Sequence, residues 1–164
     1  MIEEKLVQIL EEKNLTISSV ESCTGGSLIN RITNVEGASE VTNGGIVTYS
    51  NSQKIKLGVP AKIIRKYGVY SEECAETMAG LGMELFESDI SIGITGTLSN
   101  LDPNNMDSEE GKVYYSIMIK ENGKYLNLNS VLLVAIRERS LQKEYIVDQI
   151  ILELNRFLEN KYRL

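Results

Sequence analysis

The sequence predicts an α/β fold with three layers (α/β/α), in which helices cover both faces of a mixed central sheet. Two patterns support this prediction. Helix-like and strand-like segments alternate through the N-terminal part of the 164-residue chain, and a β-hairpin signal follows near its C-terminal end. In such folds ligands bind beyond the carboxyl ends of the strands, so we look for functional residues there.

The N-terminal segments begin with an amphipathic helix. Leu6, Ile9 and Leu10 recur at helical spacing in a charged stretch, which predicts a helix over residues 2–14. The segments after it are predicted to be a strand at 16–20, a helix at 27–33 and a strand at 45–49 that ends at Tyr49. A helix that starts at 50–52 follows, then a helix to 67 with Pro60 in its first turn and a helix to 86 with Ser71 as its N-cap.

The C-terminal part contains the hairpin. Residues 89–95 alternate like a strand that ends in Gly96, and a polar loop is expected over 97–111. Asn122-Gly123 lies between two strand-like runs, 112–120 and 125–135, and is a strong hairpin signal. A final helix, about residues 140–160, is expected to place four apolar residues on one face: Ile146, Ile150, Leu154 and Phe157.

Composition and charge limit the classes of partner. Hydrophobic residues make up 42% and charged residues 24%, which is typical of a globular chain, and the length fits a single domain over 1–164. The net charge of −6 disfavours nucleic acid and anionic membranes as partners, because phosphates attract basic surfaces. No signal peptide or membrane-spanning run is recognisable, so we expect a cytoplasmic protein.

The absence of histidine restricts the chemistry. It excludes Ser-His-Asp and Cys-His catalysis and histidine-based zinc sites. The two cysteines, Cys23 and Cys74, are too few for a structural zinc site and are expected to be reduced. A base must therefore come from lysine, a carboxylate or tyrosine. We expect no metal and no cofactor.

The segment from Val20 to Ser27 joins a strand to a helix and contains Ser22-Cys23-Thr24-Gly25-Gly26. Backbone N–H groups converge at such a junction, so Ser22 is well placed as a nucleophile with oxyanion donors beside it. Two alternatives stay open. Ser22 or Thr24 could simply cap the helix, and Cys23 could be the nucleophile if the helix N-terminus lowers the pKa of its thiol.

Lys54 is the candidate base. It lies in the first turn of the helix that follows the 45–49 strand, so Lys54 and Tyr49 could both face the same strand-end crevice as Ser22. Desolvation would lower the pKa of Lys54 and make it a base near neutral pH. The alternative is a solvated surface lysine beside a core tyrosine. Glu21 could either orient Lys54 or cap its own turn.

Several segments together resemble the C-terminal domain of the CinA family. The resemblance rests on Glu21-Ser22-Cys23-Thr24-Gly25-Gly26, Gly37-Ala38-Ser39, Val47-Thr48-Tyr49-Ser50-Asn51 with Lys54, Gly68-Val69-Tyr70-Ser71-Glu72-Glu73, Thr95-Gly96, Gly111-Lys112-Val113-Tyr114 and Arg139. It covers essentially the whole chain, and the first and third of these motifs are specific in combination.

The resemblance implies a three-layer α/β/α domain that hydrolyses nicotinamide mononucleotide to nicotinic acid mononucleotide and ammonia without a metal. It assigns Ser22 as nucleophile, Lys54 as base and Tyr49 as the third member of the site. The substrate would be a small-molecule nucleotide whose phosphate Arg139 could bind, and the family implies a homo-oligomer. Further substrate contacts are expected from Cys23, Thr24, Gly25, Gly26, Asn51, Thr95 and Gly96.

One loop departs from the family pattern. The family has a glycine-rich stretch after Thr-Gly, whereas residues 97–110 contain no glycine and carry Asp102, Asp107, Glu109 and Glu110. Carboxylates repel a phosphate, so a loop that lines the pocket would favour a different amide or an inactive, ligand-binding relative. The alternative is an acidic loop that faces away from the pocket.

Overall fold

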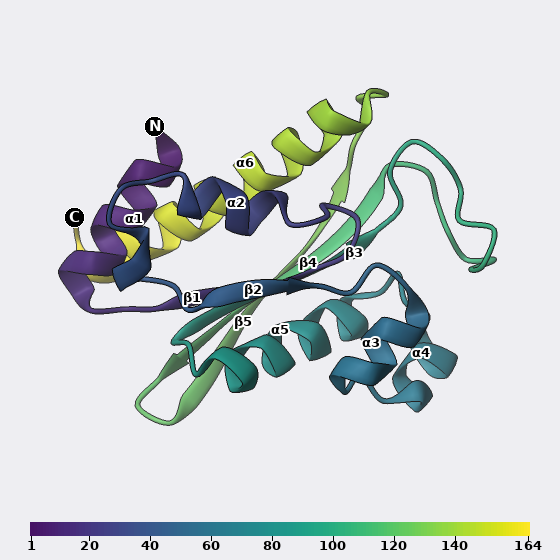
Figure 1. The fold of residues 1–164 in the computed structure, drawn as a ribbon, viewed down its shortest axis with the longest axis horizontal. Helices are drawn as coiled ribbons and strands as arrows, with labels where there is room; N and C mark the ends of the chain where they lie inside the picture. The colour runs from purple at the N-terminus through teal and green to yellow at the C-terminus, as the bar shows by residue number, and fades with distance from the viewer.

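The computed structural model describes residues 1–164 and confirms the predicted α/β class (Figure 1). The helices are α1 (Ile2–Lys13), α2 (Ser27–Thr33), α3 (Asn51–Leu57), α4 (Ala61–Tyr67), α5 (Glu72–Phe86) and α6 (Arg139–Tyr162), with a short 3-10 helix η1 (Ala38–Glu40). The strands are β1 (Ile17–Glu21), β2 (Gly44–Val47), β3 (Ile90–Gly96), β4 (Lys112–Glu121) and β5 (Lys124–Leu133).

The five strands form one mixed sheet in the order β2-β1-β3-β4-β5. β1 pairs parallel with both β2 and β3, whereas β4 and β5 continue the sheet as an antiparallel hairpin. The parallel strands β2, β1 and β3 therefore end at the same edge of the sheet, where the residues that follow each strand meet.

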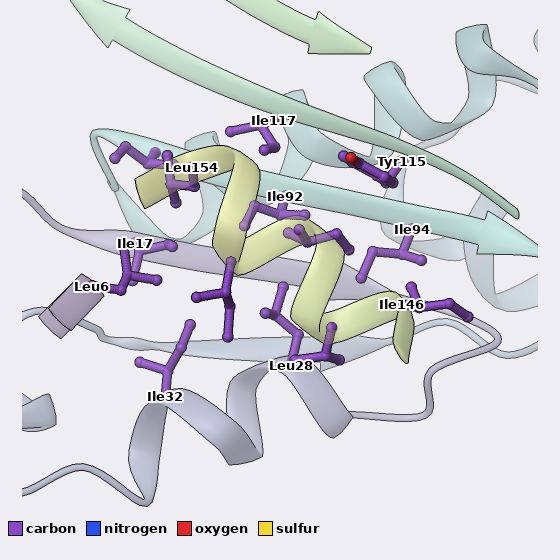
Figure 2. Packing of buried hydrophobic residues seen from close by; sticks show 14 of the residues in the cluster. Leu6, Ile17, Leu28, Ile32, Ile92, Ile94, Tyr115, Ile117, Ile146 and Leu154 are labelled. Atoms are coloured by element: carbon purple, nitrogen blue, oxygen red, sulfur yellow. The ribbon is translucent and has the colours of Figure 1, made fainter. Parts of the chain in front are cut away.

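Helices lie on both faces of the sheet. Figure 1 shows α1, α2 and α6 on one face and α3, α4 and α5 on the other. The larger core fills the first face, where side chains of β3 such as Ile92 and Ile94 meet Ile146 and Leu154 of α6 (Figure 2). Each fully buried aliphatic side chain of this kind contributes roughly 1.5–3 kcal/mol, so this core fixes the sheet that carries the site.

Three predicted boundaries shift in the structure. β2 ends at Val47 instead of Tyr49, because the chain turns out of the sheet so that Ser50 can cap α3 through the backbone N–H of Gln53. Pro60 is the N-cap of α4 rather than a residue of its first turn, and Ser71 caps α5 as predicted. The final helix begins at Arg139, so this arginine is part of α6.

None of the helices combines sufficient length with sufficient apolar character to cross a bilayer.

Candidate active site

Ser22 lies immediately after β1, at the edge where the parallel strands end. Its backbone N–H donates to the carbonyl of Ile94 (3.0 Å), which holds it against the end of β3. The turn that follows needs Gly25 and Gly26, whose φ angles of 59° and 95° lie in the left-handed region. The sequence therefore places this hydroxyl at the start of a tight turn into α2.

Lys54 reaches Ser22 from α3. Its Nζ is 2.9 Å from Ser22 Oγ and 2.9 Å from the backbone carbonyl of Thr48. Only 2% of Lys54 is exposed, so the alternative of a solvated surface lysine is wrong. Burial lowers the pKa of the Lys54 amine, although the nearby Cys74, Cys23 and Asp102 oppose the shift.

This arrangement can activate the serine. A neutral amine at Lys54 can donate one N–H to the carbonyl of Thr48 and direct its lone pair at Ser22, whose hydroxyl then donates to it. No ion pair involves Lys54, and the attraction of Asp102 does not offset the effect of burial, so the pKa of the amine stays lowered. The pair has the geometry of a nucleophile and its general base.

The backbone around Ser22 offers donors for an oxyanion. The N–H groups of Gly25 and Ser27 are used within the turn, where they donate to the carbonyls of Ser22 and Thr24. Those of Cys23 and Thr24 donate to no protein acceptor. Two free N–H groups next to a nucleophile are the donors that an oxyanion hole requires.

Glu21 caps α2 and does not orient Lys54. It is fully buried, and its carboxylate accepts the backbone N–H groups of Leu28 and Ile29, both at 3.0 Å. The hydroxyls of Thr24 and Ser19 also donate to it. The expectation that Ser22 or Thr24 caps this helix is therefore wrong, since the carboxylate takes the orphan N–H groups instead.

Replacing Glu21 with glutamine is expected to destabilise the protein by about 2 kcal/mol, because the amide NH2 would face N–H donors in a buried site. Glu36→Gln is the matched control, since Glu36 is exposed. Chemical denaturation of the two variants measures the difference. An unfolding midpoint for Glu21→Gln equal to that of the control would contradict this account of the cap.

Cys23 is not an activated thiol. Burial raises its pKa to about 12, and the effects of nearby Lys54 and Glu21 are smaller and opposed. The hypothesis of a cysteine nucleophile with a lowered pKa is therefore wrong, because desolvation outweighs any benefit of the helix terminus. Cys74 is fully buried, and burial raises its pKa to about 11.

A pocket of about 540 Å³ opens over Ser22 and Lys54. Of the other predicted site residues, it is lined by Cys23, Tyr49, Asn51, Gly96 and Arg139. A larger hollow of about 740 Å³ lies at the other end of β3, around Ser88 and Asp89, and neither Ser22 nor Lys54 lines it. The chemistry therefore belongs to the smaller pocket.

Four predicted substrate contacts lie outside the pocket lining: Thr24, Gly25, Gly26 and Thr95. The hydroxyl of Thr24 is used by Glu21, and that of Thr95 donates to the carbonyl of Val69 (2.8 Å). Both threonines are fully buried. Their hydroxyls are used inside the protein, at the turn and at the strand end, whereas the backbone N–H of Thr24 stays available and the two glycines shape the backbone.

Tyr49 forms no hydrogen bond with Ser22 or Lys54. Its side chain is at the rim of the pocket, 62% exposed, and its hydroxyl accepts a hydrogen bond from Arg139 (3.2 Å). Of the predicted Ser–Lys–Tyr arrangement, a hydrogen bond joins Ser22 and Lys54, and Tyr49 shares their pocket without such a bond to either. Tyr49 is placed to position Arg139 or a substrate rather than the amine.

The loop 97–111 lines the pocket, so the alternative in which it faces away is wrong. Asp102 and Asn105 are part of the lining, together with Tyr70 from the segment before α5. Asn105 exchanges side-chain hydrogen bonds with Asn51 at 2.8 and 3.2 Å, which attaches the loop to the first residue of α3. Sequence reasoning missed Tyr70 and Asn105, although both lie near strand ends at the functional edge.

The comparisons with known proteins agree with this architecture. The model of the CinA C-terminal domain matches residues 1–149. A relative from Alkaliphilus oremlandii, named as a competence-damage inducible protein, is 44% identical over 163 residues that cover 96% of this chain and 38% of the relative. A CinA-like protein of Dictyoglomus turgidum is 38% identical over 77% of this chain and 31% of its own length.

Solved structures of CinA superfamily proteins have the same fold as this chain. A CinA superfamily protein from Enterobacter cloacae superposes with a TM-score of 0.86 at 26% identity, covering 96% of this chain and 90% of that one. A CinA superfamily protein from Escherichia coli superposes with a TM-score of 0.82 at 27% identity, covering 93% of this chain and 86% of the solved chain. The chain thus spans nearly all of these solved chains but less than two fifths of the two sequence relatives above.

Proposed function

The chain belongs to the CinA family, and from this premise we propose that it is an amidohydrolase that converts nicotinamide mononucleotide to nicotinic acid mononucleotide and ammonia. The observation that carries the proposal is the distance of 2.9 Å between Ser22 Oγ and the buried amine of Lys54, at the base of a pocket. A hydroxyl paired with a desolvated amine suits acyl transfer in a chain that has no histidine.

The reaction would proceed through an acyl-enzyme. Ser22 Oγ attacks the carboxamide carbon while its proton passes to Lys54, and the oxyanion faces the N–H groups of Cys23 and Thr24. Lys54 then returns the proton to the departing nitrogen, so the C–N bond breaks and ammonia leaves. Water, deprotonated by Lys54, hydrolyses the ester, and Ser22 recovers its proton with release of the carboxylate product.

Arg139 supports a nucleotide as the substrate. It lines the pocket, and its only side-chain hydrogen bond goes to the neutral hydroxyl of Tyr49. No ion pair involves Arg139, so its charge is free for an anion. A guanidinium can bind a phosphate through two parallel N–H donors, and we assign this role to Arg139.

The purified protein is expected to release ammonia from nicotinamide mononucleotide, with an equal amount of nicotinic acid mononucleotide formed. Chromatography of the nucleotides and an enzymatic ammonia assay measure the two products independently. If the nucleotide raised the thermal midpoint of the protein but yielded no ammonia at equal concentrations of protein and nucleotide, the chain would be a binding module instead.

A further inference from the structure

Asp102 brings to the pocket a negative charge that forms no ion pair with any cation of the protein. It lines the same pocket as Ser22, and none of the six ion pairs of the protein includes it. Its hydrogen-bond partners are neutral: the hydroxyl of Tyr70 (2.5 Å), the amide of Asn105 (2.5 Å) and the backbone N–H of Asn104 (2.8 Å). An unneutralised carboxylate beside a pocket attracts a positively charged ligand group.

The carboxylate is held in its charged form. Burial acts to raise the pKa of Asp102, but the hydrogen bonds from Tyr70, Asn105 and Asn104 outweigh it and lower the pKa below its ordinary value. Asp102 is therefore ionised throughout the neutral pH range. Asn104 is the only donor to Oδ1, so this oxygen keeps a lone pair for a ligand.

Asp102 is also fixed relative to the nucleophile and base. Tyr70 and Asn105 both bind its Oδ2, and Asn105 is bonded in turn to Asn51. Asn51 belongs to the first turn of α3, the helix that carries Lys54. The negative charge thus has a defined position with respect to the reacting amide, which a specificity contact requires.

We propose that Asp102 is a specificity-determining residue of the Ser22 site and selects small amides that carry a positive charge on their acyl group. The pocket has one free charge of each sign, Asp102 and Arg139, which matches a ligand with a cationic ring and a separate anionic group. The amide part of this inference rests on the proposed function, whereas the selection for a cation does not.

A matched pair of ligands tests the inference without a phosphate. Nicotinamide and 1-methylnicotinamide share the ring and carboxamide, but the second carries a permanent positive charge. NMR titration of the Ser22→Ala variant, which cannot turn over either amide by this mechanism, is expected to give at least about tenfold tighter binding of the cation. Asp102→Asn in the same background is expected to remove this preference.

Two variants serve as controls. Asp107 has the same charge and lies in the same loop but outside the pocket lining, so Asp107→Asn should retain the preference. Tyr70→Phe removes a hydrogen bond and keeps the carboxylate, so it should also still prefer the cation. If Asp102 had only a structural role, Asp102→Asn would weaken the binding of both ligands equally.

The outcomes separate this inference from the proposed function. Equal binding of the two amides, or binding of neither, would overturn the role of Asp102 whatever the result of the ammonia assay. So would loss of the preference in Asp107→Asn, because the selection would then come from the general negative field. Charge-selective binding without ammonia release from the mononucleotide would retain the role of Asp102 and reject the hydrolase.

Discussion

Replacing Ser22 with alanine is expected to lower the rate of ammonia release from nicotinamide mononucleotide by at least about a thousandfold, because no acyl-enzyme can form. The fold should persist, since the side chain makes a single hydrogen bond, the one to Lys54. Lys54 retains its bond to the carbonyl of Thr48 in the variant. Steady-state kinetics and a thermal melt of the same preparation measure both effects.

Ser52→Ala is the control for this experiment. Ser52 also carries a hydroxyl on the pocket lining, but its partner is Ser50 rather than the base. Its rate should stay within a few-fold of the parent rate. If Ser22→Ala kept the parent rate, or if the two serine variants lost equal activity, Ser22 would not be the nucleophile.

Replacing Lys54 with methionine should lower kcat by roughly a hundredfold to ten-thousandfold, the range expected for loss of a general base. Methionine preserves much of the length and the apolar stem but has no lone pair of comparable basicity. Lys54→Arg should be equally inactive, because a guanidinium remains protonated at any accessible pH. Comparison of kcat for the two variants with the parent tests the base directly.

The activity of the parent protein should rise toward alkaline pH, which these variants should not show. Activity requires neutral Lys54, so log kcat/KM is expected to rise with pH until it passes the lowered pKa of the amine and then to level off. A rate profile that is flat from acid to alkaline pH, or an arginine variant with parental kcat, would be incompatible with Lys54 as the base.

The same residue gives stability a predictable pH dependence. The pKa of Lys54 is lowered on folding, so between that pKa and the ordinary value of 10.5 the unfolded chain binds more protons than the folded one. The contribution of this group to the free energy of unfolding therefore rises with pH in that window. Below the window the folded protein bears the full cost of burying the protonated amine. Lys54→Met removes this contribution, so its stability relative to the parent should decrease as pH rises through the window.

The fold was largely predictable because apolar residues recur at clear helical and strand spacings and Asn122-Gly123 is a strong hairpin signal. The pairing of Ser22 with Lys54 was also within reach, since each follows a parallel strand and the ends of such strands meet. Tyr49 lines the same pocket as Ser22, as expected, but its bond to Arg139 joins residues 90 apart in the sequence and could not be read from a local pattern.

Other features depend on contacts that local sequence cannot specify. The position of the 97–111 loop follows from the bond between Asn51 and Asn105, which are 54 residues apart. The burial of Glu21 under α2 and the desolvation of Cys23 depend on packing rather than on a motif. Only the structure shows which polar groups form hydrogen bonds inside the protein and which face the pocket.

The contact between Lys54 and the carbonyl of Thr48 has a consequence for mutagenesis. In a Ser-His-Asp triad the base is oriented by a carboxylate that one codon change can remove. Here the corresponding acceptor is a main-chain oxygen, which every amino acid at position 48 would still present. Systematic substitution across this protein should therefore identify two indispensable side chains and leave the third participant undetected.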